Sequence, residues 1–106
     1  MRWGVETYPG VAEEMAALPA GLQGRMLRLF DVIESHGLEH LHEPHVKHLD
    51  GKLWELRVKG QDGIARGIYV ALTGRRVMVL HVFAKKMQKT PVRAMALARA
   101  RMEAVT

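Results

Sequence analysis

The chain has 106 residues, with 16 Lys or Arg, 11 Asp or Glu and a formal net charge of +5. Its length predicts one domain over residues 1–106, and its lack of cysteine excludes disulfides, Cys-ligated zinc, iron–sulfur clusters and thiol catalysis. No apolar run approaches the roughly 20 residues of a membrane span and no secretory signal is visible, so we expect a soluble cytoplasmic protein that does not bind membranes.

The first half has the pattern of a short strand followed by two helices. Residues 2–7 favour a strand because Trp3, Val5 and Thr7 have high β-propensity. Apolar residues then recur at helical spacing in two segments separated by Pro19, and Gly37 stands where a helix C-cap is expected. The apolar positions are Val11, Met15 and Leu18 in the first segment, and Leu22, Met26, Leu29, Phe30 and Ile33 in the second. We therefore expect a helical hairpin.

Five histidines follow within thirteen residues. Their spacing suits no familiar metal site, and the segment has the character of a connecting loop. We interpret them as surface histidines and predict no metal, although a weak cationic role near an RNA backbone is an alternative. The five are His36, His40, His42, His45 and His48.

The second half changes to the alternation of β-strands. Residues 53–58 place Trp54, Leu56 and Val58 on an apolar face and leave Glu55 and Arg57 on a face expected to meet solvent. Residues 64–73 form a second β run.

A third strand and a helix complete the chain. Gly74-Arg75 predicts a tight hairpin into a strand over residues 76–84, and the apolar run 77–80 is typical of burial on both faces. Thr90 as N-cap and Pro91 as first residue then predict the start of a helix. The order β-α-α-β-β-β-α indicates an α+β fold.

The positive charge is concentrated in the second half. Residues 1–46 hold three bases and seven acids (net −4), whereas residues 47–106 hold thirteen bases and four acids (net +9). Such a gradient favours an anionic partner, nucleic acid first, although a charged surface that only confers solubility is an equal alternative.

Two groups of cations are candidates for a phosphate site. Lys85, Lys86, Lys89 and Arg93 lie where a strand leads into a helix N-terminus, which favours an anion; the alternative is a solvated basic loop. Arg57 and Arg66 lie within strands, where guanidinium groups can grip a phosphate at two points, and Arg57 has a structural ion pair with Glu55 as its alternative role.

Arg66 does not fit the alternation of its strand. It shares a face with Ile64 and Ile68, so the strand begins after Arg66, a bulge near Gly67 turns it, or Arg66 is a buried ion partner.

Together these segments resemble the phage-derived branch of the RelE/HigB toxin family. The resemblance runs over nearly the whole chain, and its most specific part combines Leu-Trp-Glu-Leu-Arg at 53–57 with Lys-Lys-Met-Gln-Lys-Thr-Pro at 85–91. It implies a small, largely antiparallel twisted sheet with helices on one face, and a toxin of a type II toxin–antitoxin pair that cleaves mRNA, commonly on the ribosome. Gly67 replaces a larger aliphatic residue of the family pattern, and Met87 replaces a threonine and so removes a hydroxyl.

The resemblance maps Arg57, Arg66, Lys85 and Lys86 onto basic active-site positions of the family. The chain has no acidic cluster for magnesium and no phosphate-binding glycine motif, so we expect no cofactor and a metal-independent reaction in which the 2′-hydroxyl of RNA attacks the adjacent phosphate. The arginines would stabilise charge, and a lysine, or less favourably His81, would transfer protons. Further RNA contacts are expected at Lys52, Lys59, Tyr69, Lys89 and Arg93, with Tyr69 equally well explained as a core residue.

The expected partners follow from this resemblance. They are mRNA, the ribosome and a cognate antitoxin that is acidic, HigA-like and of the helix-turn-helix type, with DNA contacted only through the antitoxin. Two other functions remain open at this point: a ParE-like toxin that inhibits gyrase, and a phage nucleic-acid-binding module without catalysis.

Overall fold

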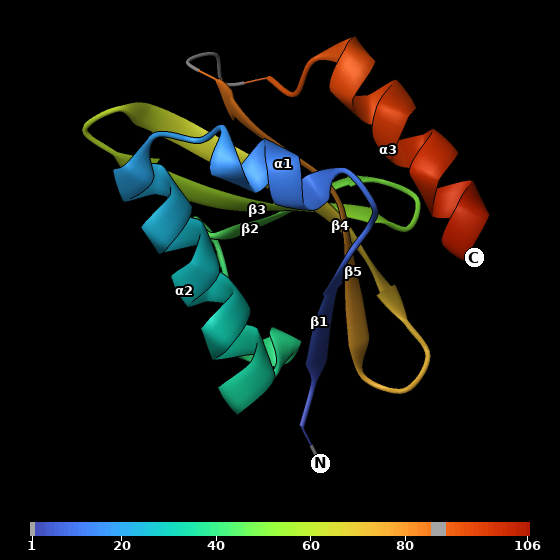
Figure 1. Cartoon of the computed structure of the whole chain (residues 1–106). Coiled ribbons are helices and arrows are strands. Elements are labelled where there is room, and N and C mark those ends of the chain that lie inside the picture. Colours follow the sequence, from blue (N-terminus) through green and yellow to red (C-terminus); the bar gives the residue numbers. More distant parts are fainter. Residues whose placement is uncertain (1, 86–88) are drawn as a thin grey trace.

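A single five-stranded sheet forms the centre of the computed structural model, which describes residues 2–85 and 89–106 (Figure 1). The strands lie in the order β1-β5-β4-β3-β2, with β1 parallel to β5 and every other pair antiparallel. The α+β class and the largely antiparallel sheet are therefore confirmed. The strands are β1 (Gly4–Thr7), β2 (Val46–Asp50), β3 (Leu53–Gly60), β4 (Gly63–Leu72) and β5 (Arg76–Lys85).

The sequence does not predict strand β2, and its first three residues belong to the segment interpreted as a histidine-rich loop. The segment contains a short 3-10 helix, Leu38–His40, and then β2, which pairs with β3 alone at the edge of the sheet. Only Val46 and Leu49 of its five residues are partly buried, so the strand lacks the apolar alternation that reveals its neighbours. The element order accordingly gains one strand.

The predicted helical hairpin is confirmed, but the expectation that the helices share one face of the sheet is wrong. Helices α1 (Val11–Ala16) and α2 (Ala20–His36) cover one face, and α2 ends at Gly37 with φ +94°. Helix α3 (Val92–Val105) packs on the other face (Figure 1). No helix in the described ranges is both long and apolar enough to cross a bilayer.

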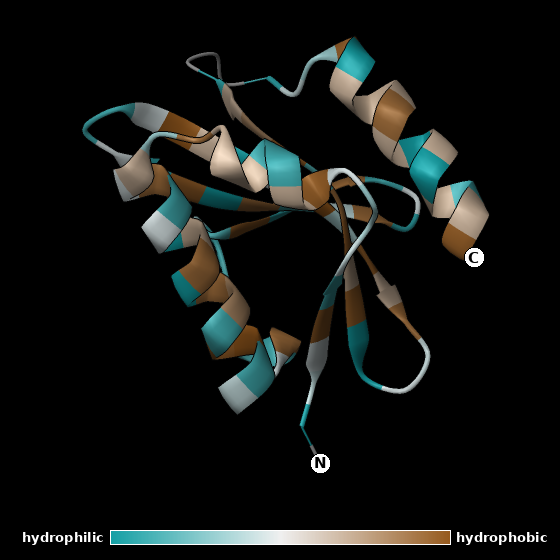
Figure 2. Cartoon of the chain, in the orientation of Figure 1, coloured by the Kyte–Doolittle hydropathy of each residue, from teal (hydrophilic) through white to brown (hydrophobic). Residues whose placement is uncertain are grey.

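The core consists of two apolar layers separated by the sheet. Met15 of α1 and Met26 of α2 belong to the same layer as Leu56 and Val79 of the sheet, whereas Ala98 of α3 belongs to the opposite layer. The central strands are largely hydrophobic along their length (Figure 2). Burial of residues 77–80 on both faces is thus confirmed. Solvent exposure of the Glu55 face of β3 is contradicted, because α3 covers that face.

Strands β4 and β5 have two local features, a tight turn and a bulge. The predicted tight turn is confirmed: Leu72 pairs with Arg76 across a three-residue loop in which Gly74 (+86°) and Arg75 (+56°) have positive φ. Further along, Ile68 pairs with His81 and Tyr69 with Val79, so that Leu80 is the extra residue of a β-bulge.

Candidate functional site

A buried polar cluster lies between the sheet and the start of α3. It contains Glu55 and Arg57 of β3, Arg66 of β4 and Thr90, which precedes α3. Glu55 Oε1 is 3.4 Å from Arg57 Nε, and Glu55 Oε2 is 3.9 Å from Arg66 Nη1. The Thr90 hydroxyl donates to Glu55 Oε2 at 2.7 Å and accepts from Arg66 Nη1 at 3.3 Å. One carboxylate and one hydroxyl therefore hold two guanidinium groups in place.

Strand register explains why these residues meet. Arg57 and Arg66 are directly paired across β3 and β4, and Glu55 is two residues from Arg57 on the same face. Two cations in such a pair repel each other, and Glu55 offsets this repulsion. With two positive charges and one negative charge, these side chains carry a net positive charge, which favours an anion beside them.

Arg66 is the buried ion partner that the sequence offered as one of three explanations. Its side chain is 0% exposed and it lies within β4, whose irregularity is at residues 68–69 and not at Gly67. Burial lowers the pKa of Arg66, the Glu55 carboxylate opposes this change, and the Arg57 cation lowers the pKa further. An arginine nonetheless remains protonated at physiological pH, so Arg66 is a fixed positive charge. Arg57, with 21% of its side chain exposed, is the member that reaches solvent.

The structure brings further predicted cations to the same end of the sheet. Lys59 of β3 and Lys85 of β5 both flank Ile64 of β4, two rungs beyond the Arg57–Arg66 pair. Lys89 and Arg93 are exposed and lie within three residues of Thr90. Lys86 and Met87 lie outside the described residues.

Two predicted RNA contacts lie elsewhere. Lys52 is exposed in the turn between β2 and β3, seven residues and thus about 20 Å of extended strand away from Lys59. Tyr69 is only 2% exposed and packs in the core layer under α2, where burial raises its pKa to about 12. Its ring is not available to stack on a base, so the core interpretation of Tyr69 is correct.

His81 belongs to a second polar cluster, which ties α1 and α3 to β5. His81 Nδ1 lies 3.0 Å from Glu14 Oε1, which also accepts a 3.0 Å hydrogen bond from the Val82 N–H. Arg101 of α3 donates from Nη1 to Glu14 Oε2 at 3.0 Å and to the Leu80 carbonyl at 2.8 Å. These contacts give His81 structural partners, and its role in proton transfer stays a prediction.

Glu14 and Thr90 carry roles that the sequence did not reveal. Strand β1 last pairs with β5 at Val79, so Glu14 satisfies the N–H group of Val82 beyond the end of β1. Thr90 had been predicted as the N-cap of α3, but Pro91 occupies that position and the Thr90 hydroxyl faces the Glu55 cluster. Glu55 lies close to two buried leucines, Leu53 and Leu56, in the same strand. An acidic residue in such an apolar segment was the sequence signal that Glu55 is buried.

The histidine-rich segment does not assemble a metal site in the part of the chain that is described. No three His, Asp or Glu side chains are grouped there so as to hold an ion. His36 and His40 lie with ring centroids 5.0 Å apart, and His48 Nε2 is 2.8 Å from the Gly51 carbonyl oxygen.

Comparisons with known proteins agree with this fold. The model of a family described as phage-derived protein Gp49-like matches residues 13–103. Escherichia coli toxin RelE, as a mutant in the free state, is 13% identical with a TM-score of 0.63, and each chain is covered in full. The RelBE2 toxin–antitoxin complex of Mycobacterium tuberculosis gives 14% identity and a TM-score of 0.59, covering 80% of this chain and 100% of that one.

A third solved structure is similar. The archaeal RelE–RelB complex of Pyrococcus horikoshii is 22% identical with a TM-score of 0.58, covering 79% of this chain and 96% of that one. At these identities the likeness establishes a RelE-like fold. No match was found among curated proteins.

Proposed function

Because this chain belongs to the phage-derived Gp49-like family, we propose that it is the toxin of a type II toxin–antitoxin pair and cleaves mRNA at the Arg57–Arg66 cluster. The observation that carries this proposal is the pair of guanidinium groups, adjacent across β3 and β4, that Glu55 and Thr90 fix in place with a net positive charge. Fixed cations of this kind can stabilise a phosphorane, whose negative charge exceeds that of the starting phosphate.

The reaction that suits these residues uses the RNA's own nucleophile. The 2′-oxygen forms a bond to the adjacent phosphorus, the bond to the 5′-oxygen breaks, and the products are a 2′,3′-cyclic phosphate and a free 5′-hydroxyl. Arg57 contacts the phosphate from the solvent side, and Arg66 adds charge behind it. Lys85 and Lys86 are the proposed proton carriers, one to accept the 2′-hydroxyl proton and one to protonate the leaving oxygen.

The same proposal defines the setting and the partners. The substrate is mRNA on the ribosome, so the protein acts in the cytoplasm. A cognate antitoxin neutralises it, a partner supported by two solved relatives that are toxin–antitoxin complexes. The proposed antitoxin is acidic and of the HigA-like helix-turn-helix type, and the toxin meets DNA only through it.

The test is to map RNA ends after brief induction in cells and on programmed ribosomes in vitro. The variant of choice is Arg57→Ala, because Arg57 is partly exposed and water can replace its contact with Glu55, whereas Arg66 is fully buried. We expect cleavage to fall about 100-fold or more with the thermal midpoint nearly unchanged.

Three results would count against the proposal. Intact mRNA during growth arrest would refute it, and inhibition of gyrase in that case would favour a ParE-like toxin. Salt-sensitive RNA binding without cleavage would favour a nucleic-acid-binding module. Full activity of a folded Arg57→Ala protein would refute the assigned site.

A further inference from the structure

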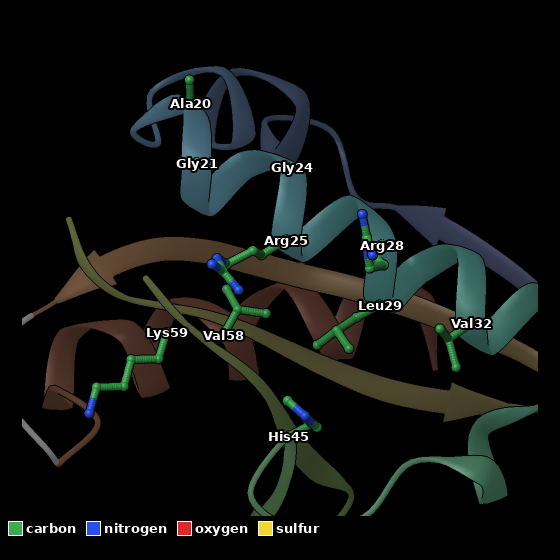
Figure 3. Close-up of a pocket in the computed structure, with 10 residues that line it drawn as sticks. All are labelled: Ala20, Gly21, Gly24, Arg25, Arg28, Leu29, Val32, His45, Val58 and Lys59. Carbon is green, nitrogen blue, oxygen red and sulfur yellow. The ribbon is translucent and has the colours of Figure 1, made fainter. Parts of the chain in front are cut away.

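A groove of about 750 Å³ lies between α2 and the end of β3 (Figure 3). Its apolar residues are aliphatic: Leu29 and Val32 of α2 and Val58 of β3. The start of α2 carries small residues here, so a partner's backbone can approach the helix closely. The lining is completed by Ala20, Gly21, Gly24, Arg25, Arg28, His45 and Lys59.

The groove is positively charged. Residues 1–46 contain only three bases, and two of them, Arg25 and Arg28, line the groove one helical turn apart. Arg25 extends from α2 toward Val58 (Figure 3). Lys59 adds a third cation, and none of the ten lining residues is acidic. The complementary ligand therefore carries carboxylates around an aliphatic centre.

The sheet edge beside the groove is open at Lys59. The Arg57 N–H donates to the His45 carbonyl at 2.9 Å, and β2 begins one residue after His45. Because backbone groups alternate along a strand, the N–H and C=O of Lys59 point to the same side as those of Arg57. In the described ranges, no backbone group pairs with Lys59 on that side. An extended peptide can therefore add there as a continuation of the β2 position.

We propose that this groove binds an extended, acidic segment of the antitoxin, with aliphatic side chains on Leu29, Val32 and Val58 and carboxylates on Arg25 and Arg28. The assignment rests on the proposed function, which supplies the antitoxin. A peptide fits better than RNA because the apolar part of the groove is aliphatic and the lining has no Phe, Tyr or Trp on which a base can stack.

The bound segment would lie next to the catalytic cations without covering the Glu55 cluster, which is on the α3 side of the sheet. A smaller adjoining pocket is lined by His45, Lys59 and Arg57. The antitoxin would therefore compete with RNA for Lys59 and Arg57 at the strand end.

The experiment measures binding of the small protein encoded beside this chain's gene to four purified variants. Arg25→Glu with Arg28→Glu reverses the charge of the groove, and Arg2→Glu reverses one exposed base outside it. Gly24→Leu fills the groove, because a Cβ at Gly24 meets no atom within 4 Å, and Gly24→Ala is its small counterpart.

We expect the double reversal and Gly24→Leu each to weaken binding at least tenfold, and Arg2→Glu and Gly24→Ala to change it less than threefold. Amide exchange at Lys59 should slow in the wild-type complex. RNA cleavage by the Arg25→Glu, Arg28→Glu protein should persist.

The outcomes separate the two proposals. If the wild-type chain does not bind the neighbouring protein, the toxin–antitoxin function is refuted together with the groove assignment. If it binds and all variants bind equally, or Lys59 exchange is unchanged, only the groove assignment is refuted. If the double reversal abolishes RNA cleavage and spares antitoxin binding, the groove is an RNA path instead.

Discussion

The Thr90 hydroxyl links the chain segment before α3 to both charges of the buried pair. It donates to Glu55 and accepts from Arg66, so it fixes the orientation of the carboxylate and the guanidinium together. Arg66 has no exposed surface and depends on these neighbours for its position. Thr90 is thus a positioning residue for the proposed reaction, since it acts through Arg66 and not on the RNA.

We predict that Thr90→Val destabilises the protein by about 1–3 kcal/mol, because Glu55 loses a buried hydrogen-bond donor. Cleavage at saturating RNA should fall about tenfold as Arg66 loses a fixing contact, whereas RNA affinity should change little. Denaturant unfolding and single-turnover cleavage measure the two effects.

Thr90→Ser keeps the hydroxyl and should restore both properties. Thr73→Val, at an exposed turn residue, makes the same chemical change and should shift stability by less than about 0.5 kcal/mol. Unaltered turnover in a folded Thr90→Val protein would show that the contact is purely structural.

At the scale of elements, Glu14 joins three pieces that the sheet itself does not connect. Helix α1 supplies the carboxylate, β5 supplies the Val82 N–H and His81, and α3 supplies Arg101. Burial alone would raise the pKa of Glu14, but the hydrogen bond from Val82 and the contacts with His81 and Arg101 together lower it. The ionised form is therefore the one that stabilises the fold.

We predict that this contribution is lost in acid. A lowered folded-state pKa means that the unfolded chain binds the proton first, so Glu14 stabilises the fold above its ordinary value of 4.5. The stability falls as the pH drops below 4.5 and through the folded-state pKa. Glu14→Gln should cost about 1 kcal/mol at pH 7 and flatten the acid decline, as measured by urea unfolding between pH 7 and 3.

Glu13→Gln is the matched control, since Glu13 is the exposed neighbour on α1 and should leave the acid profile unchanged. Part of the decline should survive in Glu14→Gln, because the pKa of Glu6 is also lowered, by its hydrogen bond to Arg76. An identical acid profile in Glu14→Gln and wild type would contradict the role of Glu14.

Sequence patterns predicted the elements with strong local signals and missed those determined by packing. The helical hairpin, the turn at Gly74 and the doubly buried run 77–80 follow from periodicity and turn chemistry. Strand β2 has too few buried residues to show a period, and its pairing depends on β3. The placement of α3 opposite α1 and α2 reversed the expected exposure of Glu55, because alternation shows that a strand has two faces but not what covers them.

The sequence predicted the cations of the site but not the hydrogen bonds and ion pairs that join them. Arg57, Lys59, Arg66 and Lys85 gather at one end of the sheet because register brings them there, and their charge was visible in the sequence. Thr90 was recognised as a helix signal, and only the tertiary fold directs its hydroxyl to Glu55. For Tyr69 the sequence suggested a contact with RNA, but the fold buries its ring in the core.

At the scale of the whole molecule, a comparison of two lysines at the two ends of β3 can test where RNA binds. Lys52 and Lys59 are both exposed and lie at opposite ends of the strand, with the proposed catalytic cluster at the Lys59 end. Both substitutions to alanine remove one positive charge, so a long-range effect of net charge would be the same for the two. A direct phosphate contact would distinguish them.

We therefore predict that Lys59→Ala weakens binding of single-stranded RNA severalfold and reduces the slope of log K against log salt by about 0.7, the value for one phosphate contact on a single strand. Lys52→Ala should leave the slope unchanged. Fluorescence anisotropy at salt concentrations between about 50 and 300 mM measures the RNA affinity and the salt slope of each variant. Equal slopes for the two variants would mean that the positive charge acts as a diffuse field, and the RNA path would then have to be sought away from the end of β3.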